Sequence, residues 1–209
     1  GIGTPATQSY FIKVSASAAP AITTTPVTVA ITGVPYQYDV DATGNPAPTY
    51  SLTTFPAGMT INSTTGLIQW TPDATGDFAV TVRASNGFGT PADQGFSIHV
   101  DASVAPAITT TPVTSVYAGK PYQYDVDATG NPVPTYSLIT YPPGMTINSA
   151  TGLIQWTPAV PGDVNVKVRA SNGIGTPAEQ TFTISVVAVP PLPVGMIHYW
   201  KLDEAGGPP

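Results

Sequence analysis

The chain has 209 residues, a formal net charge of −6 and no cysteine. Six lysines and arginines in total are too few to neutralise a run of phosphates, which excludes a nucleic-acid partner, and disulfides are excluded too. With 20 glycines, 24 prolines and no apolar run of about 18 residues, the composition favours short strands joined by turns and no membrane-spanning segment.

The sequence repeats itself with a constant offset. Between residues 19–104 and 105–190, 62 of 86 positions are identical without a gap. Residues 1–14 follow the same offset and align with residues 87–100 and 173–186. We therefore expect four parts in chain order: the last strand of a preceding repeat (1–18), repeat 1 (19–104), repeat 2 (105–190) and a tail (191–209).

The N-terminal part carries one apolar face. Tyr10, Ile12 and Val14 stand at alternate positions, so in a strand they face one way, toward a core that this part does not itself contain. Such a strand pairs with a sheet edge or completes a neighbouring sandwich. We predict that these three are assembly residues, whose partners are neighbouring repeats or identical chains joined head-to-tail.

The first half of repeat 1 contains alternating and turn-forming stretches. Ala21–Thr25 lies between two prolines, which suits an edge strand. Tyr36, Tyr38 and Val40 alternate with polar residues, which predicts a strand with an aromatic inner face. Gly44-Asn45-Pro46 is expected to turn the chain.

A hairpin and a final strand pair are expected next. Met59 and Ile61 lead into the polar turn 62–66, and Ile68 and Trp70 share one face of the returning strand, which makes Trp70 the expected core centre. Residues 78–84 and 96–100 alternate again, with Asn86-Gly87 as a turn whose Asn side chain bonds local backbone. About seven strands per repeat predict an all-β fold of tandem immunoglobulin-like sandwiches.

Three runs of each repeat bear a family resemblance. Residues 56–61 (PAGMTI), 65–72 (TGLIQWTP) and 80–87 (VTVRASNG) resemble the immunoglobulin-like repeats of bacterial surface proteins, relatives of the dystroglycan-type cadherin-like domain. The resemblance implies an extracellular or cell-surface stalk, adhesin arm or spacer. Residues 195–204 (GMIHYWKLDE) are similar to the first strand of laminin-G or concanavalin A-like lectin domains. This implies that residues 191–209 are a linker and the first strand of a lectin-like domain.

Calcium enters through the same resemblance, because cadherin-like domains often bind it. A calcium site needs several convergent oxygen ligands. Gly44 and Asn86 stand where the family often has an acidic residue, so two expected ligands are missing. We expect no cofactor and treat as weak candidates four outward carboxylates that a solvated strand face explains: Asp39, Asp41, Asp125 and Asp127.

Catalytic groups are scarce. His99 and His198 are the two histidines, and neither recurs in the other repeat. Glu179 and Glu204 are the only glutamates, so no repeated acid/base pair and no Ser/His/Asp arrangement can be built within a repeat. We expect no enzymatic activity.

Three functions fit these observations. The first is a non-catalytic spacer or stalk of a large secreted or cell-surface repeat protein, polymerised into an extracellular filament in one version. Because the linker 100–106 has no glycine, we expect a head-to-tail rod, with about 35–40 Å per domain at a strand rise of ~3.3 Å. The second is an adhesion or carbohydrate-binding module that uses loops such as Thr43–Pro48. The third is an accessory region of a secreted polysaccharide-degrading enzyme.

Overall fold

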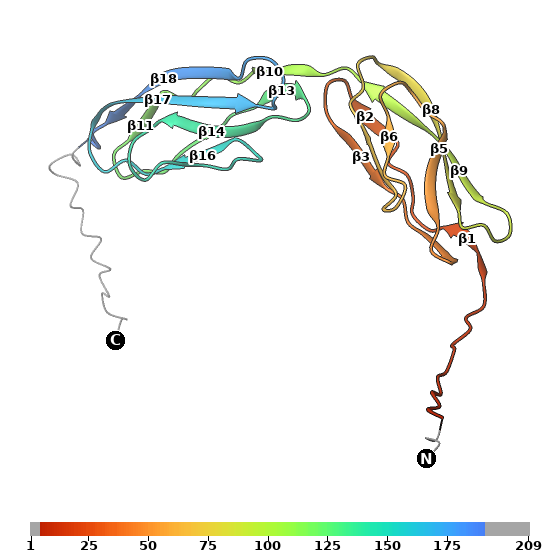
Figure 1. The fold of residues 1–209 in the computed structure, drawn as a ribbon. Coiled ribbons are helices and arrows are strands. Elements are labelled where there is room, and N and C mark those ends of the chain that lie inside the picture. Colours follow the sequence, from red (N-terminus) through yellow and green to blue (C-terminus); the bar gives the residue numbers. More distant parts are fainter. Residues whose placement is uncertain (1–4, 191–209) are drawn as a thin grey trace, which may run out of the picture. The chain divides into compact units, whose positions relative to one another are not determined.

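The computed structural model describes residues 5–190, and the predicted lectin-like strand in residues 191–209 lies outside them (Figure 1). The chain divides into two compact units, Gly1–Val104 and Ala105–Pro209. Within the described part every regular element is a β-strand, which confirms the expected all-β class. Strands β1–β9 form the first sandwich and β10–β18 the second, so each has nine strands rather than the seven expected per repeat.

Unit 1 is built from three groups of hydrogen-bonded strands. A four-stranded sheet has the order β2-β9-β8-β5, a three-stranded sheet has the order β3-β7-β6, and β1 pairs with β4. All pairs are antiparallel except β2 with β9. The strands are β1 (Ala18–Ile22), β2 (Val29–Ile31), β3 (Tyr36–Asp39), β4 (Ala42–Asn45), β5 (Thr49–Thr54), β6 (Thr60–Ile61), β7 (Leu67–Trp70), β8 (Gly76–Ser85) and β9 (Ala92–Asp101).

Unit 2 has the same strand order, and within its two larger sheets the strands pair in the same registers as in unit 1. Its sheets have the orders β11-β18-β17-β14 and β12-β16-β15, and β10 pairs with β13. The strands are β10 (Val104–Ile108), β11 (Ser115–Tyr117), β12 (Tyr122–Asp125), β13 (Ala128–Asn131), β14 (Thr135–Thr140), β15 (Thr146–Ile147), β16 (Leu153–Trp156), β17 (Gly162–Ser171) and β18 (Ala178–Val187).

The core of unit 1 lies between its two larger sheets, as the alternation predicts. Trp70 is 5% exposed, and its ring makes edge-on contacts with those of Tyr36 and Phe78, at centroid distances of 6.5 and 5.1 Å. The indole Nε1–H donates to the carbonyl oxygen of Ala57 at 3.2 Å, so this buried donor has a partner. The predicted hairpin is confirmed, since β6 pairs with β7 and Ile61 lies opposite Ile68.

Three details of the first half differ from the sequence prediction. The edge strand β1 starts at Ala18 and includes Pro20, which a shift of register between Ala18 and Ala21 accommodates because proline cannot donate a ladder hydrogen bond. The predicted turn at Gly44-Asn45 belongs instead to β4, which pairs with β1. Strand β2 was not expected at all.

The side chain of Asn86 is hydrogen-bonded to this region. Its side-chain amide donates to the carbonyl oxygens of Ala18 and Pro46, at 2.7 and 2.8 Å, and so joins the β1 end to the segment after β4. Its Oδ1 accepts from the backbone N–H of Phe88 at 3.0 Å, which is the local bond expected of a turn residue. The sequence prediction was therefore right about one of three bonds and missed the two distant ones.

Candidate functional surfaces

The predicted assembly residues lie outside any sheet. Residues 5–17 form no strand in the structure, and Figure 1 shows them leading away from β1. Tyr10, Ile12 and Val14 are 76%, 74% and 87% exposed. Their apolar face therefore has no partner within the sandwich of unit 1, and their role in assembly stays a prediction.

The four candidate calcium ligands are all exposed. Asp39 and Asp125 occupy outward positions of β3 and β12, while Asp41 and Asp127 follow those strands. Across residues 5–190, no three acidic or histidine side chains are grouped closely enough to hold a metal ion. Calcium binding stays untested for these residues.

An exposed histidine stands between two carboxylates on the outer surface of unit 1. His99 Nδ1 lies 2.7 Å from Asp77 Oδ1 on the neighbouring strand, and its Nε2 lies 3.5 Å from Asp101 Oδ1. The hydrogen bond with Asp77 is the main cause that raises the pKa of His99. Ser185 occupies the equivalent position of unit 2, so this cluster belongs to unit 1 alone.

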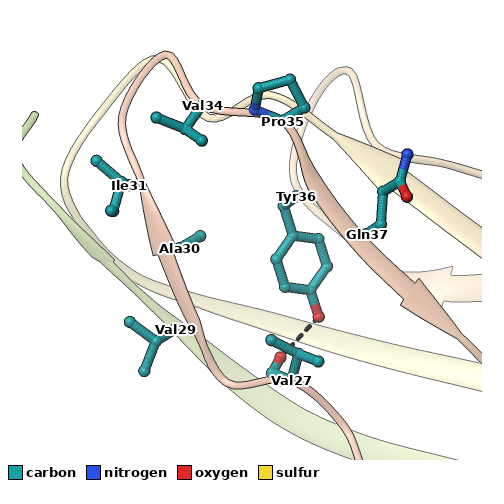
Figure 2. A pocket seen from close by; sticks show the side chains of 8 residues that line it. All are labelled: Val27, Val29, Ala30, Ile31, Val34, Pro35, Tyr36 and Gln37. Atoms are coloured by element: carbon teal, nitrogen blue, oxygen red, sulfur yellow. Dashed lines mark hydrogen bonds between the residues drawn. The ribbon is translucent and has the colours of Figure 1, made fainter. Parts of the chain in front are cut away.

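A recess opens in unit 1 beside β2 and the start of β3. Its volume is about 300 Å³, and Figure 2 shows the Tyr36 ring entering it with its hydroxyl directed at Val27. That hydroxyl donates to the carbonyl oxygen of Val27 at 2.6 Å, and burial raises the pKa of Tyr36 to about 12, so the phenol is neutral. The lining residues are Val27, Val29, Ala30, Ile31, Val34, Pro35, Tyr36 and Gln37.

The recess coincides with the most divergent stretch of the repeat. Residues 29–34 (VAITGV) correspond to 115–120 (SVYAGK), and one of the six positions is identical. By contrast, 13 of the 14 positions that follow, 35–48, are identical to 121–134. The edge strand β2 therefore varies, while β3 and β4, which follow it in the chain, are identical in the two repeats.

The connection between the two units is short and its beginning is hydrogen-bonded to unit 1. Only Ala102 and Ser103 separate β9 from β10. The backbone N–H of Ser103 donates to Thr32 Oγ1 at 2.8 Å, and the backbone N–H of Thr32 donates to the carbonyl oxygen of Asp101 at 2.9 Å. Asp101 and Ser103, at the C-terminal end of unit 1, are thus hydrogen-bonded to Thr32, the residue that follows β2.

A comparison with protein families matches both units. The model of the family described as Putative Ig domain covers residues 3–101 and 105–187. The chain belongs to this family. The tandem Ig-like domains expected from the sequence are thereby confirmed.

The chain is also similar to solved structures of other Ig-domain proteins. A chimeric titin Z1Z2 carrying an exogenous decorin peptide is 19% identical, with a TM-score of 0.56 over 85% of this chain and 100% of that one. The tandem Ig repeats of Dlar are 18% identical, with a TM-score of 0.35 over 82% of this chain and 100% of that one. Sidekick-1 domains 1–5 are also 18% identical, with a TM-score of 0.43 over 81% and 39%. A comparison with curated proteins found no match.

The loop Thr43–Pro48 of the first Ig domain is packed rather than free. Gly44, Asn45 and Pro48 are half-buried, and Asn86 binds the Pro46 carbonyl oxygen as described above. A methyl group on Gly44 would lie 3.0 Å from Asn86 Nδ2. Ligand binding by this loop stays a prediction, and two of its groups, the Pro46 carbonyl oxygen and the Thr43 hydroxyl, already form hydrogen bonds within the domain.

No helix in residues 5–190 is long and apolar enough to cross a lipid bilayer. Apart from tyrosines, no polar or charged side chain is buried in the described part of these Ig domains.

Proposed function

We propose that the chain is a non-catalytic spacer of a large secreted or cell-surface repeat protein, in which tandem Ig-like domains hold the groups on either side apart. In one version the repeats assemble further into an extracellular filament. Membership of the Ig-like family and the fold shared with titin Z1Z2 support a structural or adhesion-type module.

The short connection carries this proposal. A spacer must limit the freedom between its domains, and two residues between β9 and β10 leave little chain to flex. Ser103, one of the two, donates its backbone N–H to Thr32, so the effective hinge is shorter still. Neither residue is a glycine.

Distance measurements between the domains test the proposal. Since the chain has no cysteine, spin labels can be attached through cysteines at Ser63 and Ser149, which are equivalent exposed turn positions. We expect a narrow distance distribution that broadens when Gly-Ser-Gly is inserted between Ala102 and Ser103. A distribution as broad in the unaltered chain as in the insertion variant would contradict a spacer role.

An adhesion or carbohydrate-binding module is the second candidate, and the recess of unit 1 favours it. Its apolar lining, an aromatic ring and the exposed amide of Gln37 combine features found in small ligand sites. Because unit 2 has Ser115 in place of Val29, the substitution Val29→Ser is a natural test. If the chain binds a glycan on an array and Val29→Ser abolishes that binding, adhesion becomes the preferred function. If no glycan binds, the spacer function remains preferred.

An accessory role in a secreted polysaccharide-degrading enzyme is the third candidate. No catalytic group of residues 5–190 argues for it, so it depends on what the rest of the parent protein contains. A catalytic domain encoded in the same gene, with activity on polymeric but not soluble substrate lowered by deleting both Ig domains, would support it.

A further inference from the structure

Residues 6–15 are a third copy of a strand that the structure shows twice. Under the 86-residue offset they correspond to β9 and β18. Nine of the fourteen residues 1–14 are identical to residues 173–186. Both domains already contain their own strand of this type, and residues 5–17 form no strand beside them. The third copy therefore has no place in either sandwich.

The structure shows what a strand of this type does. Strand β9 lies between β8, to which it is antiparallel, and β2, to which it is parallel. Ile98 and Val100 are fully buried, and the Phe96 ring makes an edge-on contact with Tyr38 at a centroid distance of 5.7 Å. A sandwich without β9 would lose these core contacts, and both β2 and β8 would lose a paired strand.

We propose that residues 6–15 are a donor strand: they supply the last strand of a further Ig-like sandwich of this family, whose equivalents of β1–β8 are not among residues 19–190. Tyr10, Ile12 and Val14 stand at the positions of Phe96, Ile98 and Val100. Since Phe96 is only partly buried, the hydroxyl of a tyrosine in its place can reach solvent. This inference names a partner and holds whether the tandem domains act as a spacer or in adhesion.

The outward residues of the donor strand also suit the position of β9. Lys13 stands at the position of His99, which faces Asp77 across the β8–β9 pair. A lysine there places a permanent positive charge opposite the Asp77 equivalent, where unit 1 has a histidine. Phe11 stands at the outward position of Ser97, so it contributes nothing to the completed core.

An extended chain tests the proposal. A copy of residues 19–90 is placed directly before Pro5, so that the added sandwich must take residues 6–15 as its last strand. In a control chain the added copy is residues 19–101 and brings its own β9. We expect a third folded domain in both chains. Amide exchange of residues 6–15 should be at least about 100-fold slower in the first chain than in the control, because in the first chain exchange requires the added sandwich to open.

Two substitutions in the first extended chain complete the test. Ile12→Asp should unfold the added domain alone, while Phe11→Ser should leave it folded, because Ile12 enters the core and Phe11 does not. The proposal is overturned if the control folds and the first chain does not, if residues 6–15 exchange freely, or if the two substitutions act alike.

Discussion

A methyl group added to Gly66 would lie 2.1 Å from the carbonyl oxygen of Val40. Gly66 ends the turn between β6 and β7 with a φ of +82°, and its own carbonyl oxygen accepts from the backbone N–H of Val40 at 3.2 Å. Unit 2 repeats both the contact and the bond with Gly152 and Val126. The turn is therefore locked against the strand that carries the tyrosine face.

Gly66→Ala should be strongly destabilising. The left-handed backbone costs about 1–2 kcal/mol for alanine, and the clash with Val40 adds about 1–3 kcal/mol. Gly58→Ala is the matched control, because Gly58 has a φ of +79° and open space around its Cβ position. In calorimetry of the whole chain we expect the melting temperature of unit 1 to fall clearly further for Gly66→Ala. Equal effects would mean that the turn moves away from Val40 without loss.

Asn86→Asp should destabilise unit 1 at neutral pH although it keeps the side-chain shape. The carboxylate cannot donate to Ala18 and Pro46, so two hydrogen bonds of about 0.5–1.5 kcal/mol each are lost and like partial charges face each other. Asn62→Asp is the control, since the structure uses Asn62 through its acceptor Oδ1, toward the N–H groups of Thr64 and Thr65. Urea unfolding should separate the two variants, and equal midpoints would contradict the proposed role of Asn86.

His99→Ser should make unit 1 less stable in acid but not in alkali. The protonated imidazole binds Asp77 and lies near Asp101, while β2 offers the apolar Val29 at this point of the register. Since the pKa of His99 is raised in the folded domain, its stabilisation is complete below the unfolded pKa of about 6.5 and is lost as pH rises through the folded pKa. The gap in melting temperature between native and variant chains should therefore close from pH 5 to pH 9. A gap independent of pH would contradict this.

Phe78→Val should make Trp70 resemble Trp156. Unit 2 has Val164 where unit 1 has Phe78, and Trp156 is only partly buried. Losing the edge-on ring contact should cost about 0.5–1.5 kcal/mol beyond the lost apolar area. In chains whose other tryptophans are phenylalanine, Trp70 emission should shift to longer wavelength, and Val164→Phe should shift Trp156 emission the opposite way. Unchanged spectra would show that Phe78 does not shield Trp70.

The sequence allowed the local parts of this fold to be predicted. Alternation placed Tyr36 and Tyr38 inward, and the hairpin around Gly66 follows from neighbouring residues alone. The pairing of β2 with β9 joins residues about 70 positions apart through three residues with no distinctive pattern, so only the folded chain shows it. Likewise, Asn86-Gly87 is a typical turn sequence, and no neighbouring residue indicates the hydrogen bonds of Asn86 to the distant Ala18 and Pro46.

The candidate surfaces divide in the same way. The proposed role of Tyr10, Ile12 and Val14 comes from the sequence, because residues 6–15 copy a strand seen elsewhere in the chain. The recess beside β2 could not, because its residues come from a stretch that differs between repeats and read as an ordinary apolar run. The histidine cluster needed the β8–β9 register, which brings Asp77 opposite His99 across 22 positions of sequence.

The near-identity of the two cores bears on how the chain reaches its native state. In unit 1 β8 pairs with β9, in unit 2 β17 pairs with β18, and nine residue pairs align in each case in the same register. Each long strand therefore meets two acceptable partners in a denatured chain. Refolding the whole polypeptide at once should yield molecules with exchanged strands, whereas synthesis from the N-terminus lets the first domain close before the competing strand exists.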